Sequence, residues 1–63
     1  MTIEVTDNPS SLKFYGVAAR ELPNGSYKFE RLDRLTWNIT VEDKDCDTLT
    51  DWLDDHGFAW RLV

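Results

Sequence analysis

Residues 35–57, LTWNITVEDKDCDTLTDWLDDHG, change their hydrophobic period halfway along. Apolar side chains first alternate with polar ones, at Leu35, Trp37, Ile39 and Val41. After an acidic connection they recur at i, i+3, i+4 and i+7, at Leu49, Trp52, Leu53 and His56. A period of two residues is typical of a strand and the second spacing is typical of an amphipathic helix. The stretch therefore predicts a strand followed by a helix that begins near Thr48.

Both ends of this helix carry residues that favour capping. Asp47 or Thr48 can cap the N-terminus, and Thr48 with Asp51 three residues later resembles a capping box. Gly57 follows the last apolar position, where a glycine with positive φ commonly ends a helix.

Three more segments are expected to form strands. Thr2–Thr6 alternates around Ile3 and Val5 and is a candidate edge strand. Leu12–Arg20 is apolar on both faces, so as a strand it is either covered on both sides or turns one face toward a partner. Phe58–Val63 has the aromatic, alternating character of a closing strand.

Turn residues between these segments indicate how they connect. Leu22–Ser26 contains Pro-Asn-Gly, which favours a hairpin between Leu12–Arg20 and a strand that starts at Tyr27. The alternation then slips at 31–34. Residues 27–42 are therefore one bulged strand or two strands joined by a tight turn, and two strands is our preferred interpretation.

The order hairpin, strand, helix, strand predicts an α+β fold. We expect an antiparallel sheet of four to five strands with one amphipathic helix packed on one face. The 63 residues, 1–63, suffice for a single small domain. A chain of this length buries only about 60% of its surface on folding. Three Trp, three Phe and two Tyr residues are available to fill its core.

Composition limits the function classes. A net charge of −5 argues against direct nucleic-acid binding, because phosphate contacts supply most of that affinity. No signal peptide or membrane-spanning segment is evident, and Cys46 is the only cysteine, so a cytoplasmic protein without membrane contact is expected.

Groups for catalysis are sparse. Cys46 lies ten residues before His56, or about 15 Å along a helix, which excludes a Cys–His dyad. Ser10 and Ser11 lack an identifiable base. We therefore expect no catalytic residues, no cofactor and no enzymatic activity.

Asp43, Asp45 and Asp47 alternate, and Asp54 falls at the twelfth position counted from Asp43, as in part of a calcium-binding loop. The sixth position is Thr48 instead of glycine, and the predicted helix would separate Asp54 from Asp43. We therefore assign no metal ligands, and a small calcium-dependent module remains an alternative.

Asp47, Asp51, Asp54 and Asp55 share one side of the predicted helix, opposite its apolar residues. Such a face either serves only solubility or docks on a basic protein surface, such as the groove of a nucleic-acid enzyme. Tyr15 and Val17, on the doubly apolar segment, are candidate anchors for the same partner.

These observations favour a small acidic protein-binding domain. We expect an inhibitor or modulator of the kind that phages and mobile elements encode. The main alternative is a structural subunit that forms homo-oligomers through an edge strand, either Thr2–Thr6 or Phe58–Val63.

Overall fold

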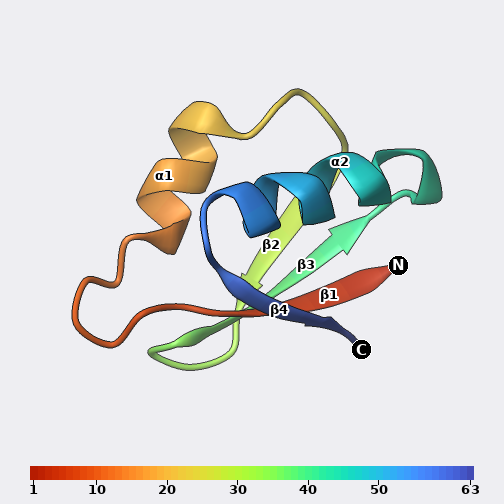
Figure 1. The fold of residues 1–63 in the computed structure, drawn as a ribbon. Helices are drawn as coiled ribbons and strands as arrows, with labels where there is room; N and C mark the ends of the chain where they lie inside the picture. The colour runs from red at the N-terminus through yellow and green to blue at the C-terminus, as the bar shows by residue number, and fades with distance from the viewer.

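The computed structural model describes residues 1–63. Its elements are β1 (Thr2–Thr6), α1 (Phe14–Glu21), β2 (Tyr27–Arg31), β3 (Thr36–Val41), α2 (Asp43–Asp55) and β4 (Ala59–Leu62). The four strands form one antiparallel sheet in the order β2-β3-β1-β4, with α2 lying across it and α1 beside it (Figure 1). The predicted α+β class is confirmed, with two helices instead of one.

Strand β1 lies in the interior of the sheet. Ile3 is aligned with Ile39 of β3 on one side and with Leu62 of β4 on the other. The prediction that Thr2–Thr6 forms an edge was therefore wrong, and β2 and β4 are the edges. The alternation of apolar and polar residues could not distinguish an edge strand from an interior one. An interior strand with one covered face shows the same pattern as an edge strand.

Strands β2 and β3 are separate, as preferred from the sequence. Asp33 in the intervening turn accepts hydrogen bonds through Oδ1 from the amides of Leu35 and Thr36, each at 2.8 Å. A side chain that satisfies nearby backbone amides in this way stabilises a tight turn. The slip in the alternation therefore marks a turn and not a bulge.

The segment predicted as a strand over Leu12–Arg20 is instead helix α1. Phe14 and Ala18 are buried one helical turn apart, and half-buried Val17 lies beside them. This i, i+3, i+4 spacing was hidden because most of the segment's other residues are also apolar or aromatic.

The hairpin predicted at Leu22–Ser26 was also wrong. These residues connect α1 to β2, and the amide of Leu22 donates to the carbonyl of Ala18 at the end of the helix. Gly25 does not adopt positive φ, so the Asn-Gly pair does not form the hairpin turn expected of it.

Helix α2 begins at Asp43, before the predicted start at Thr48. Glu42 is its N-cap without a side-chain capping bond, and Asp43 and Asp45 lie in the first turn, where carboxylates favour the helix dipole. Thr48 is therefore inside the helix, and the predicted capping box is wrong.

The predicted end of α2 is confirmed. Gly57 has a φ of 73°, its amide donates to Asp54 O, and the amide of Phe58 donates to Leu53 O. This pair of bonds forms a Schellman motif, for which a glycine is the favoured residue. The motif turns the chain directly into β4.

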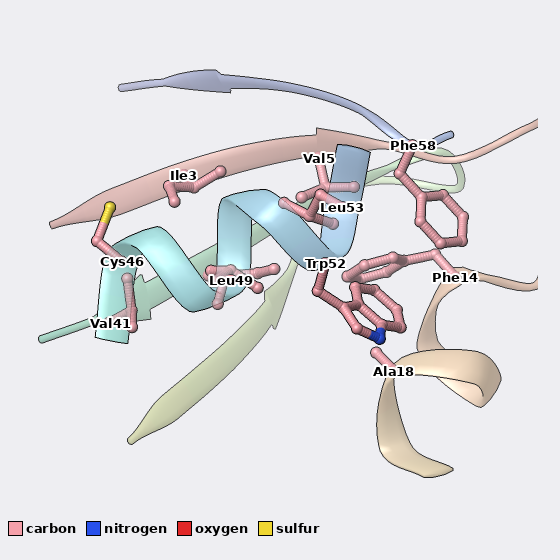
Figure 2. Close-up of a cluster of buried hydrophobic side chains, with 11 residues drawn as sticks. Ile3, Val5, Phe14, Ala18, Val41, Cys46, Leu49, Trp52, Leu53 and Phe58 are labelled. Carbon is pink, nitrogen blue, oxygen red and sulfur yellow. The ribbon is translucent and has the colours of Figure 1, made fainter. Parts of the chain in front are cut away.

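The core lies between the two helices and one face of the sheet (Figure 2). Its eleven buried members are Ile3, Val5, Phe14, Ala18, Ile39, Val41, Cys46, Leu49, Trp52, Leu53 and Phe58. Phe14 is completely buried and contacts both layers. Its ring centroid lies 5.1–6.4 Å from those of Phe58, Trp37, Phe29 and Trp52.

We predict that Phe14→Ala lowers the free energy of unfolding by about 3–5 kcal/mol, because it removes a fully buried ring and leaves a cavity. Chemical denaturation measures the loss. Leu32→Ala, at a leucine that is 49% exposed, should change stability by no more than about 0.5 kcal/mol. Equal stability of the two variants would contradict the packing of α1.

Candidate protein-binding surface

The outer side of α2 carries an acidic face, defined here as Asp47, Asp51, Asp54 and Asp55. All four residues are exposed. The opposite side of the helix buries Cys46, Leu49, Trp52 and Leu53. The predicted separation of charged and apolar sides is thus confirmed, with Cys46 as an added core residue.

No cation in the protein neutralises the acidic face. The ion pairs of the structure join Lys44 to Glu42, His56 to Glu21 and Arg61 to Glu4, and none includes an aspartate of α2. Side chains four residues apart on a helix are neighbours, so Asp47, Asp51 and Asp55 repel one another along one line. The face is available to a partner without breaking any internal ion pair.

Asp54 differs from the other three aspartates of the face. Its Oδ1 accepts a hydrogen bond of 2.8 Å from the indole Nε1 of Trp60 in β4. Trp60 is half-buried and packs against the core, so Asp54 also helps to hold the edge strand to α2. Its replacement would affect the fold as well as the charge.

Asp45 points away from the acidic face toward the segment before β2. It accepts hydrogen bonds from the backbone amide of Ser26 at 3.2 Å and from Ser26 Oγ at 3.0 Å. The amide bond, then the hydroxyl bond, lowers the pKa of the Asp45 carboxyl from its usual value. This carboxylate ties the start of α2 to the loop that follows α1.

The calcium-loop pattern does not form a metal site. Asp43, Asp45 and Asp47 lie within a continuous helix, and the helical rise places Asp54 about 16 Å along the axis from Asp43. No group of three or more His, Cys, Asp or Glu side chains is placed to hold a metal ion. The helix therefore contradicts the loop geometry on which the calcium-dependent alternative was based.

Tyr15 and Val17 were predicted as anchors on a strand, but both lie on helix α1. Tyr15 is 50% exposed, and its ring stacks on Trp37 with centroids 4.9 Å apart and an interplanar angle of 7°. Val17 is half-buried and packs against the core. A partner on this side would reach the Tyr15 ring more readily than Val17.

His56 closes the last turn of α2 and touches α1. Its Nδ1 lies 2.9 Å from the carbonyl oxygen of Trp52, and its ring stacks on the Trp52 indole at 4.2 Å. Its Nε2 is 4.0 Å from a carboxylate oxygen of Glu21. His56 therefore contacts the C-terminal parts of both helices, whereas Cys46 lies near the N-terminal end of α2.

Arg31 and Arg34 were not predicted as site residues. In the structure both line a pocket beside Tyr15 and Trp37. These residues come from α1, the end of β2, the β2–β3 turn and β3, so no local pattern could have joined them.

Comparison with models of known protein families, with curated proteins and with solved structures finds no match to this chain. Neither helix is long and apolar enough to cross a membrane.

We predict that Asp45→Asn makes stability less dependent on pH in the acid range. Because folding lowers the pKa of Asp45 below its ordinary value of 3.8, the ionised carboxylate stabilises the fold above that value. This contribution is lost as the pH falls through the folded-state pKa. Thermal melts between about pH 5 and pH 2 should show a smaller decrease for Asp45→Asn than for the wild type.

Ser26→Ala provides the matching variant, because it removes the hydroxyl donor and leaves the backbone amide. It should give an intermediate pH dependence. If the stability of the Asp45→Asn protein falls with pH as much as that of the wild type, these hydrogen bonds do not act in solution.

Proposed function

We propose that this protein binds another protein through the acidic face of α2 and thereby inhibits or modulates it. The observation that carries the proposal is a row of exposed carboxylates, Asp47, Asp51 and Asp55, without any internal cation. The partner presents a basic surface, for example the groove of a nucleic-acid enzyme.

Stability gives no reason for this concentration of charge. The apolar side of α2 attaches the helix to the sheet, while neighbouring aspartates on the outer side cost a few tenths of a kcal/mol per close pair. A receptor with lysines or arginines opposite the row would replace this repulsion by attraction. Complementary charge of this kind also accelerates encounter and makes association sensitive to salt.

The helix sets the size of the receptor site. Asp55 lies eight positions after Asp47, so the row extends about 12 Å along the axis. The basic side chains of the partner must be spread over a similar length. Tyr15, with half of its surface exposed, is proposed as a separate apolar contact on α1 that a large partner would also reach.

We predict that Asp51→Lys weakens binding by about twofold to thirtyfold, because it replaces an attraction worth about 0.2–1 kcal/mol by a repulsion of similar size. The partner is first captured on the tagged chain from the lysate of its source and identified by mass spectrometry. Affinity is then measured with the purified partner at two salt concentrations.

Glu30→Lys is the matched control. It changes the net charge equally, on the exposed, uncovered side of edge strand β2. It should bind nearly as the wild type does. Equal losses in the two variants would assign the effect to net charge, and intact affinity in Asp51→Lys would remove the acidic face from the interface.

A second candidate function, self-association, is favoured by the free edge of β4. This strand pairs only with β1, and Leu62 and Val63 at its end are 56% and 73% exposed. An unpaired strand edge with apolar side chains is a template for a second strand. Two copies could thus join their β4 strands into a continuous sheet.

Self-association predicts a mass that rises with concentration in sedimentation experiments. Leu62→Lys should abolish this rise, because charge on an edge strand opposes pairing with another chain. Leu32→Lys, at a similarly exposed leucine in the β2–β3 turn, should preserve it. A constant monomer mass in the wild-type protein would exclude this candidate.

A further inference from the structure

A pocket of about 290 Å³ lies between α1 and the β2–β3 turn. We call it the arginine pocket, because Arg31 and Arg34 line it together with Tyr15, Gly16, Trp37 and Asp7. It lies apart from the acidic face, none of whose residues lines it. The chain as a whole carries a charge of −5, so two arginines in one concavity are a local exception.

The whole guanidinium group of Arg34 and part of that of Arg31 are available to a ligand. Arg31 is oriented by hydrogen bonds from Nε to Asp33 O at 3.1 Å and from Nη2 to Arg34 O at 3.4 Å. Its guanidinium carbon lies 5.8 Å from the Trp37 ring centroid. The side chain of Arg34 makes no hydrogen bond or ion pair, and neither arginine is paired with a carboxylate.

The two nearest carboxylates have other partners. Asp33 accepts from the turn amides of Leu35 and Thr36, and these bonds, with a smaller contribution from the charge of Arg31, hold its pKa below the usual value. Asp7, which forms part of the pocket wall, is only 4% exposed. Its two oxygens accept from the amides of Asn8 at 2.8 Å and Phe14 at 3.1 Å. The lining of the pocket therefore has two arginines against the single carboxylate of Asp7, and neither arginine forms an ion pair with it.

The remaining wall is aromatic and open. Tyr15 and Trp37 stack against each other, and the half-exposed Tyr15 ring leaves apolar surface next to the arginines. At Gly16 a side-chain carbon would meet no atom within 4 Å, so α1 leaves free space at this point. A ligand can thus combine contact with the aromatic ring and contact with the guanidinium groups.

We propose that the arginine pocket binds a phosphate monoester carried on a planar or apolar group. A phosphate monoester carries a charge of about −1.5 to −2 near pH 7, which matches two arginines better than a single carboxylate does. The planar fork of arginine donates two parallel hydrogen bonds to such an oxyanion. The pocket is at the small end of ligand sites, so one phosphorylated group fits it and a long chain does not.

This ligand chemistry has two sources, a free mononucleotide and a phosphorylated tyrosine of a protein. Both place the phosphate on a planar group. The proposal does not depend on the acidic face, because none of the four aspartates lines the pocket and the arginines carry the opposite charge. Only Tyr15 belongs to both proposals.

The test is a titration of the isotope-labelled full chain with phenyl phosphate, followed by nuclear magnetic resonance. The indole N–H resonance of Trp37 should shift with saturation, while those of Trp52 and Trp60 serve as internal references outside the pocket. Phenol, which lacks the phosphate, should give no saturable shift. Adenosine monophosphate and a phosphotyrosine tripeptide are then compared, and the tighter ligand identifies the source.

Arg34→Gln should weaken phenyl phosphate binding by about tenfold, as expected for the loss of one charge-assisted hydrogen bond. Because the Arg34 side chain is exposed and makes no internal bond, the spectrum away from the pocket should be preserved. Lys28→Gln removes the same charge from an exposed position of β2 and should change affinity by less than about twofold.

Two results would overturn the proposal. One is the absence of a saturable Trp37 shift with all three phosphates at concentrations up to about 10 mM. The other is equal binding in Arg34→Gln and Lys28→Gln, which would assign the shifts to diffuse charge.

Discussion

The contact of Phe14 with four other aromatic rings determines how the helices lie on the sheet. The ring touches Phe29 and Trp37 of the sheet on one side, and Trp52 and Phe58 on the other. Asp7 holds the backbone amide of Phe14 and so fixes where α1 starts. A chain with one cysteine cannot form an internal disulfide, and edge-to-face packing of rings replaces a covalent constraint here. The orientation of Tyr15, one residue later, follows from the same anchor.

The period change over 35–57 was sufficient to predict β3, the buried side of α2 and its end at Gly57. Each of these depends on local spacing or on local backbone conformation. The residues of α1 were misassigned because Phe14, Tyr15 and Val17 fit a strand as well as a helix, and burial of Phe14 decides between them. The early start of α2 was missed because Asp is a poor helix former except near the N-terminus, where the dipole favours it.

The two candidate surfaces also differ in whether local sequence spacing could reveal them. The acidic face could be identified from sequence because one helix carries all of its residues at fixed spacing. The arginine pocket could not, since Arg34 and Tyr15 belong to segments that only the packing of α1 brings together. The two surfaces also carry opposite charges, because carboxylates without ion pairs lie on α2 and guanidinium groups without ion pairs lie beside α1.

The position of β1 inside the sheet has a further consequence. Because β4 pairs with β1 in antiparallel register, residues 1 and 63 lie side by side, and the amide of Val63 donates to Thr2 O at 3.0 Å (Figure 1). A short linker could join these ends without crossing the core, with new ends opened in the exposed loop at Pro23–Gly25. The same geometry would allow the domain to be inserted as a cassette into a surface loop of another protein.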